Sequence, residues 1–246
     1  MRFGLHSLMN KLLNPLRIIQ AILFIFSTSY NSYAQDSLAK LKVTSDIHEY
    51  RKQVDASPGK QMLEMKSRIP DLVYDLRYAS KNNFIHRYMY PKGTSLCFLR
   101  KDAVEALAKV QSVLLLKGYG LKIFDGYRPY AVTVKFWELV KDERYVANPA
   151  KGSGHNRGIA VDLTIIEMNS RKELDMGTGF DNFTDSAHHS FSDLPQNVLE
   201  NRSYLRHTME QAGFRALETE WWHYIFSAAG NYELLDLPFK KLRKAL

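Results

Sequence analysis

The sequence of 246 residues contains a single cysteine, Cys97. An intramolecular disulfide is therefore excluded, and the core must stabilise the fold unaided, which a chain of this length can do. Cys97 stands between apolar residues in SLCFLR, which predicts a small buried hydrophobic side chain rather than a nucleophile. The sequence also lacks internal repeats and any interior stretch rich enough in Gly, Pro or Ser to divide it, so we expect one main domain.

Long apolar runs and basic clusters are also missing. Outside the N-terminus no run approaches the ~20 apolar residues of a transmembrane helix. The formal charge of +8 is spread along the chain. No Lys/Arg run with interleaved aromatic residues is present, which argues against a nucleic-acid partner.

The first 34 residues have the composition of a secretory signal peptide. They are basic and free of acidic residues, and they contain the apolar run IIQAILFIF (18–26). Ser32 and Ala34 are small residues at the −3 and −1 positions of a cleavage site before Gln35. We therefore expect residues 1–34 to be removed, leaving a secreted or periplasmic protein without a membrane span. An uncleaved anchor helix is the alternative, although the apolar run is short for one.

The remaining chain divides into a polar N-terminal arm or linker, residues 35–67, and a domain over residues 68–246. In this domain the apolar patterns predict four strands and three helices. The strands are expected at 71–79, 121–129, 158–166 and 221–227, and the helices at 100–120, 130–142 and 197–214. This mixture favours an α+β fold, with helices packed on one face of a mainly antiparallel sheet.

An unexpected carboxylate interrupts one predicted strand. In SGHNRGIAVDLTI (153–165), Asp162 has apolar neighbours on both sides. A buried carboxylate is costly unless it is paired or bound to a cation. A salt bridge or a backbone cap would explain it, and so would a metal site, because Gly154 and Gly158 would allow the preceding loop to bring His155 to Asp162.

A second cluster, EWWHY (220–224), contains Glu220 and His223. Positions three apart on a regular strand face opposite sides, so these two side chains converge only if Glu220 sits on a bend at the start of the strand. A hydrogen-bonded core histidine is the simpler interpretation of His223 alone. Together with His155 and Asp162, however, His223 completes the three-ligand set of a catalytic zinc site, and Glu220 supplies the free carboxylate of a general base.

Other polar residues give weaker signals. Arg128, in DGYRP (125–129), follows a buried strand and precedes a proline that forces an extended backbone. It could bind a substrate carboxylate or an oxyanion, although most such arginines simply reach solvent. His188 and His189 are rival metal ligands, but adjacent strand residues cannot both point at one ion. The histidines without suitable partner spacing are His48, His86 and His207.

Two motifs taken together resemble a known family. The pattern Ser153-x-His155-x-x-Gly158-x-Ala160-x-Asp162, followed by Glu220-x-Trp222-His223, is similar to the paired signature of the D-alanyl-D-alanine metallopeptidases. These enzymes share their fold with the hedgehog signalling domain and lysostaphin-type endopeptidases. Within that group the chain most resembles the D-alanyl-D-alanine dipeptidases. The resemblance covers roughly residues 68–240 and extends to DLRYASKNNF (75–84), DGYRP and MGTGFDNFTDSAHH (176–189).

The resemblance implies one Zn²⁺ per chain, bound by His155, Asp162 and His223, with Glu220 as general base. It implies that Arg128 stabilises the tetrahedral intermediate. It further implies that Asp181 binds the substrate ammonium and that Tyr78 and Ser153 line the dipeptide pocket.

The activity implied is hydrolysis of the D-Ala-D-Ala dipeptide, with peptidoglycan fragments as further partners. Two alternatives stay open, a D,D-carboxypeptidase of peptidoglycan stem peptides and a non-catalytic zinc-stabilised binding module. The chain departs from the family in its secretory leader and arm, and in a connection between Arg128 and Ser153 that can be longer in other members.

Overall fold

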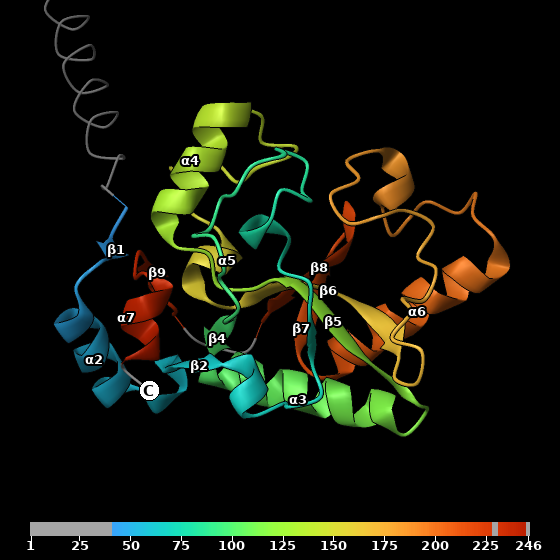
Figure 1. The fold of residues 1–246 in the computed structure, drawn as a ribbon, viewed down its shortest axis with the longest axis horizontal. Coiled ribbons are helices and arrows are strands. Elements are labelled where there is room, and N and C mark those ends of the chain that lie inside the picture. The colour runs from blue at the N-terminus through green and yellow to red at the C-terminus, as the bar shows by residue number, and fades with distance from the viewer. Residues whose placement is uncertain (1–40, 228–230, 245–246) are drawn as a thin grey trace, which may run out of the picture. The chain divides into compact units, whose positions relative to one another are not determined.

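Five strands form the central sheet of the computed structural model, in the order β3-β5-β6-β8-β7 (Figure 1). Strand β3 is parallel to β5, and the remaining neighbours are antiparallel. The middle strand β6 is buried at all but its last position, as expected for a run of β-branched and other apolar residues covered on both faces. The strand bounds are β3 (Val73–Tyr74), β5 (Tyr119–Asp125), β6 (Ala160–Glu167), β7 (Phe214–Leu217) and β8 (Glu220–Phe226).

Two long helices, α3 (Lys101–Leu115) and α6 (Gln196–Gln211), pack against this sheet and against each other. The buried residues of α3 recur at three- and four-residue spacing, from Ala103 to Leu114, and form one apolar stripe. In Figure 1, α3 runs along the lower side of the sheet. The predicted α+β class, with a mainly antiparallel sheet and helices packed on it, is confirmed.

Shorter elements surround the sheet. Strands β1 (Val43–Thr44) and β9 (Leu234–Leu235) pair in parallel, and β2 (Met62–Glu64) pairs antiparallel with β4 (Phe98–Arg100). The other helices are α2 (Ile47–Ala56), α4 (Tyr130–Val140), α5 (Gly154–Arg157) and α7 (Phe239–Arg243), with 3-10 turns η2 (Pro58–Lys60), η3 (Met65–Ser67), η4 (Arg77–Ala79) and η5 (Asp185–Ala187).

The structure describes residues 41–227 and 231–244, so the predicted signal peptide lies outside the described residues. One compact unit begins at Lys42 and includes residues 42–67. The described residues of the expected N-terminal arm pack on the rest of this unit, because Met62 and Met65 are fully buried and the Met62 amide donates to the Tyr50 hydroxyl at 2.7 Å. In the described part of the chain, no helix has the length and apolar character needed to cross a membrane.

The strand expected over residues 71–79 is much shorter than predicted. Pairing with β5 ends after the Asp75 amide donates to the Ile123 carbonyl, and the chain then turns through η4. This turn buries Tyr78 against the rings of Tyr90 and Phe136 instead of continuing the sheet. The departure from the predicted strand thus delivers Tyr78 to the cavity described below.

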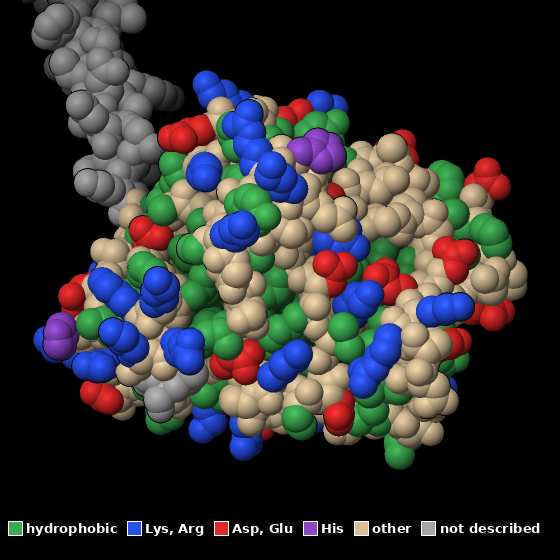
Figure 2. Space-filling view, viewed as in Figure 1, with side chains coloured by type: hydrophobic (Ala, Val, Ile, Leu, Met, Phe, Trp, Pro, Cys, Tyr) green, Lys and Arg blue, Asp and Glu red, His purple; other side chains and the backbone are tan. Residues whose placement is uncertain are grey.

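The spread of surface charge and the burial of the single cysteine agree with what the sequence predicts. Figure 2 shows Lys and Arg side chains spread over the viewed face with Asp and Glu between them. Cys97 is buried, 3% exposed, and burial raises the pKa of its thiol well above the ordinary value. A neutral, buried thiol is a poor nucleophile, as predicted.

Candidate metal and active site

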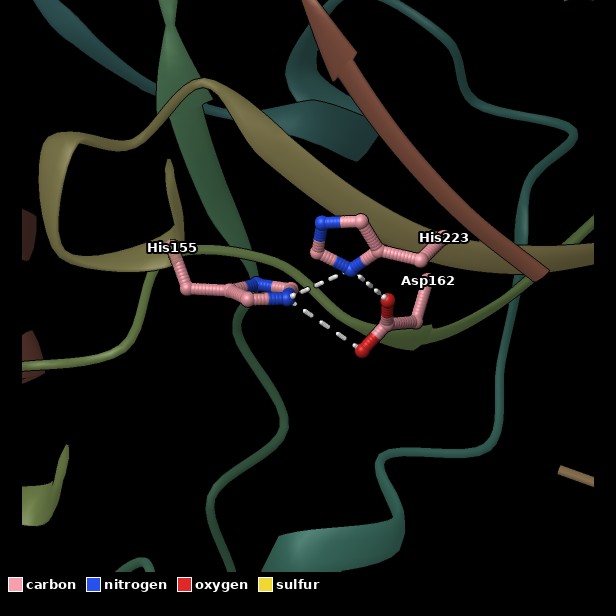
Figure 3. Close-up of side chains that lie close together, drawn as sticks. All are labelled: His155, Asp162 and His223. Carbon is pink, nitrogen blue, oxygen red and sulfur yellow. Dashed lines mark hydrogen bonds and ion pairs between the residues drawn. The ribbon is translucent and has the colours of Figure 1, made fainter. Parts of the chain in front are cut away.

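Three side chains from three elements converge on one point (Figure 3). Asp162 on β6 and His223 on β8 are direct partners in the strand register, and His155 comes from α5. His223 Nδ1 lies 2.8 Å from Asp162 Oδ1, and His155 Nε2 lies 3.4 Å from Asp162 Oδ2 and 3.3 Å from His223 Nδ1. The structure therefore brings together the three residues that the sequence predicted as metal ligands.

The single turn α5 is what presents His155 to the strands. Its first residue is capped by Ser153, whose hydroxyl accepts from the Asn156 amide while the Asn156 side chain accepts from the Ser153 amide. Gly158 ends the turn with φ at +70°, a conformation that favours glycine. The predicted folding back of this loop onto Asp162 is confirmed.

The tautomer of His155 leaves one of its ring nitrogens free to bind a cation. His155 Nδ1 lies 2.7 Å from the Gly126 carbonyl, which can only accept, so Nδ1 carries the hydrogen and Nε2 of a neutral ring presents a lone pair. This lone pair faces the Asp162 carboxylate and the second imidazole. The ligand atoms all lie within 4.8 Å of one another. Two imidazole nitrogens and a carboxylate oxygen, buried together, fit a three-ligand zinc site with an open fourth position.

Glu220 reaches the same cavity because β8 begins irregularly. The β7–β8 pairing shifts its register between Ala216 and Leu217, and Leu217 then pairs with Glu220. As a result Glu220 Oε2 lies 3.9 Å from His223 Nδ1, although the two residues are three apart on one strand. Burial raises the pKa of the Glu220 carboxyl above its ordinary value. Such a carboxyl is suited to accept and return a proton.

A buried ion pair fixes the guanidinium of Arg128. Asp125 Oδ2 accepts from Arg128 Nε at 3.1 Å and from Nη2 at 2.8 Å, and Asp125 Oδ1 accepts from the Tyr90 hydroxyl at 2.6 Å. Burial alone would lower the pKa of Arg128, but the Asp125 carboxylate raises it, so the charge is retained. Arg128 lines the cavity and lies over the rings of Tyr78 and Phe136.

The cavity also carries the carboxyl group of Asp181, beside Tyr78. The Tyr78 hydroxyl donates to Asp181 Oδ1 at 3.1 Å, and Asp181 has a left-handed backbone with φ of +61°. Burial raises the pKa of Asp181, so a cationic partner would favour its ionised form. Asp181, Tyr78 and Ser153 line the same cavity of roughly 340 Å³ as the three clustered side chains, Glu220 and Arg128.

The rival histidines lie elsewhere. His189 packs beside Tyr224, and its Nε2 has no hydrogen-bond partner in the described part of the chain. Burial lowers the pKa of His189 to about 4. His188 lies near the exposed Asp185. The cluster formed by His155, Asp162 and His223 includes neither of these residues, nor His48, His86 or His207.

Two functional contacts were missed at the sequence level. Asp125 is the first residue of DGYRP, and a carboxylate at the end of a buried strand indicates a partner for Arg128. Asn156 is fully buried and donates to the Arg128 carbonyl at 2.9 Å and to Thr133 Oγ1 at 2.8 Å. It thus ties the turn that carries His155 to the backbone of Arg128.

A family model described as D-ala-D-ala dipeptidase matches residues 59–242. The chain belongs to the D-Ala-D-Ala dipeptidase family. Within this peptidase family it is 35% identical to the D-alanyl-D-alanine dipeptidase of Escherichia coli (strain K12), over 73% of this chain and 91% of the relative. The D-alanyl-D-alanine dipeptidase of Enterococcus faecium is 30% identical, over 62% of this chain and 84% of the relative.

A third relative in the D-Ala-D-Ala dipeptidase family is the D-alanyl-D-alanine dipeptidase of Enterococcus faecalis (strain ATCC 700802 / V583). It is 29% identical, over 68% of this chain and 87% of the relative. Among solved structures, a vancomycin resistance D,D-pentapeptidase in complex with Zn(II) matches 54% of this chain and 75% of that chain. Its identity of 16% and TM-score of 0.35 are too low to bear on function.

Proposed function

We propose that this protein is a zinc peptidase that hydrolyses the D-alanyl-D-alanine dipeptide to free D-alanine. The observation that carries the proposal is the convergence of His155, Asp162 and His223 beside Glu220 and Arg128 in one cavity. Membership of the dipeptidase family supports the same substrate. We assign one Zn²⁺ per chain to the three clustered side chains.

Each residue around the cluster has a distinct part in hydrolysis. The chemistry that zinc supplies in such a site is acidification of water and polarisation of a carbonyl. Glu220 accepts the proton of the attacking water and passes it to the leaving amine, a task suited to its raised pKa. Arg128, held by Asp125, donates to the oxygen on which negative charge develops.

Recognition of the substrate ammonium is assigned to Asp181 and its neighbours in the cavity. Asp181 binds the ammonium, and the Tyr78 hydroxyl orients the Asp181 carboxylate. Ser153 lines the pocket beside His155. A carboxylate that requires a free ammonium disfavours longer acylated chains, which separates a dipeptidase from a D,D-carboxypeptidase.

We further propose that the protein works outside the cytoplasm, after removal of residues 1–34, in the turnover of cell-wall peptides. The support is the composition of the leader, with its apolar run and the small residues Ser32 and Ala34. N-terminal sequencing of the protein recovered from the periplasm or medium should begin at Gln35. Recovery of the intact leader in the membrane fraction would refute cleavage.

The activity is tested with zinc-loaded protein and a series of substrates of increasing length. D-Ala-D-Ala should be hydrolysed far faster than an N-acylated tripeptide ending in D-Ala-D-Ala. Glu220→Gln should abolish turnover while the zinc content stays at one per chain. Glu218→Gln is the matched control, because Glu218 contacts the surface residue Arg206 and should leave turnover unchanged.

Preference for the acylated tripeptide would point to the carboxypeptidase alternative. Zinc-loaded protein that is inert on both substrates would leave the binding module as the better account.

A further inference from the structure

A buried arginine on α6 holds the segment that carries Asp181. Arg202 is only 4% exposed, and its guanidinium donates to three backbone carbonyls. Nε donates to Met176 at 2.8 Å, Nη2 to Ser186 at 2.8 Å and Nη1 to His188 at 3.1 Å. In the described part of the chain no carboxylate forms an ion pair with Arg202, so these carbonyls are the groups that replace its hydration.

The three carbonyls belong to the two ends of one loop. Met176 precedes Arg202 by 26 residues, and Ser186 and His188 precede it by 16 and 14. One guanidinium therefore brings the start and the end of residues 176–188 together, and Asp181 lies in the middle. The planar fork of arginine is suited to this task, because it presents several donors in a fixed geometry.

The loop closed in this way follows an unusual path. Gly177 has φ of +77° and approaches α6 so closely that an added Cβ would lie 2.9 Å from Val198 Cγ1. Asp181 has φ of +61°, a conformation that costs a non-glycine residue energy and persists only where the surroundings impose it. Inside the loop, Phe180 packs on Phe124 and Trp222, and Trp221 Nε1 donates to Thr178 Oγ1 at 2.8 Å.

Burial of the Arg202 charge at the base of this loop costs free energy. Desolvation lowers the pKa of Arg202, and an apolar side chain at this position on α6 would avoid that cost. The gain is the fixed distance between the two ends of the loop, which sets where Asp181 stands relative to Tyr78 and the metal cluster.

We propose that Arg202 is a positioning residue for substrate binding, which closes the base of residues 176–188 and so fixes the Asp181 carboxylate where the substrate ammonium binds. This inference rests on the proposed function, because it takes the role of Asp181 from it. Arg202 does not line the cavity and acts only through the loop.

The test is a double-mutant cycle with Arg202→Gln and Asp181→Asn, measured on zinc-loaded protein with D-Ala-D-Ala. A displacement of about 1 Å at a positioned group can cost up to roughly 100-fold, so we expect Arg202→Gln to raise KM about tenfold, with less than a twofold change in kcat. In the Asp181→Asn background the same substitution should change KM less than twofold, because the carboxylate that it positions is already gone.

Arg206→Gln is the matched control, since Arg206 lies one turn further along α6 and pairs with Glu210 and Glu218 at the surface. Its KM should stay that of the wild type. If Arg202→Gln does not fold, Arg202→Lys, which keeps the charge and some of the donors, takes its place in the cycle.

Amide hydrogen exchange provides a second readout that does not depend on turnover. In the Arg202 variant, exchange should accelerate in residues 177–187 while β6 and β8 keep their protection. Unchanged exchange in the loop, or a uniform acceleration along the chain, would overturn the proposal. So would an equal rise in KM in the wild-type and Asp181→Asn backgrounds. A wild-type protein inert on every D-dipeptide would instead refute the proposed function.

Discussion

Replacement of Asp125 by asparagine tests how the structure holds Arg128. The substitution keeps the size of the side chain and removes the negative charge that accepts from Arg128 Nε and Nη2. Asp125 is 1% exposed and Arg128 8%, so water cannot replace the lost partner. The guanidinium would be left buried with an amide oxygen that still accepts one hydrogen bond.

The expected cost follows from this burial. Removal of one partner of a buried ion pair costs about 3–5 kcal/mol, and the remaining hydrogen bond places Asp125→Asn near 3 kcal/mol. A typical domain has roughly 5–15 kcal/mol in total, so the variant should fold with reduced stability. Because Arg128 is misplaced rather than deleted, kcat should fall about ten- to a hundredfold, less than the roughly 10²–10³ lost with an oxyanion donor.

The assay is urea unfolding of the zinc-loaded protein together with kcat and KM for D-Ala-D-Ala. Zinc content is measured in parallel, because Asp125 Oδ2 also lies 3.7 Å from His155 Nδ1. Asp75→Asn is the control, since Asp75 pairs with Arg77 at 2.8 Å but is 35% exposed and should cost under ~1 kcal/mol. Equal, small losses of stability in the two variants, with kcat unchanged, would refute the importance of the buried pair.

Three further predictions concern other parts of the site and its surroundings. Because burial raises the pKa of Glu220, its ionised form destabilises the zinc-free fold above pH 4.5. Glu220→Gln should therefore raise the melting temperature of zinc-free protein at pH 7, and a lower melting temperature would contradict this reasoning. The pKa of His189 is lowered from 6.5 to about 4, so its contribution to stability is complete above pH 6.5 and is lost as the pH falls toward 4. In calorimetry His189→Asn should reduce this loss of stability, by at most ~3 kcal/mol before screening is considered. Gly158→Ala places a Cβ 2.8 Å from Met62 at φ of +70°, so titration with a chelator should show weaker zinc binding through displacement of His155, and unchanged affinity would argue against this coupling.

The sequence predicted the parts of the fold and site that leave long or specific patterns. The strand around Asp162 and the helix at 101–115 carry enough apolar residues for a periodicity to be read. Asp162 could be recognised because a carboxylate is out of place in such a run. The ligand set and Glu220 followed from two motifs together with the family resemblance, and the structure brings them into one cavity.

The short strands of two or three residues could not be predicted, because such segments are too short to show a period. Their pairing with residues distant in sequence, as between β1 and β9, decides that residues 42–67 belong to the compact unit. The partners of Arg202 could not be predicted either, because they depend on tertiary contacts. A surface arginine and a buried one have the same appearance in a helical sequence until the tertiary contacts are known.

The direct pairing of Asp162 with His223 across β6 and β8 has a consequence for how this family can diversify. Strand register sets their separation, so the loop between β6 and α6 can lengthen, shorten or be replaced without changing that pairing. That loop includes residues 176–188 with Asp181, whereas Arg202 on α6 and Glu220 on β8 lie outside it. Substrate choice can therefore change by exchange of this loop while Asp162 and His223 stay paired. Transplanting the loop from relatives offers a route to altered peptide length without rebuilding the metal centre.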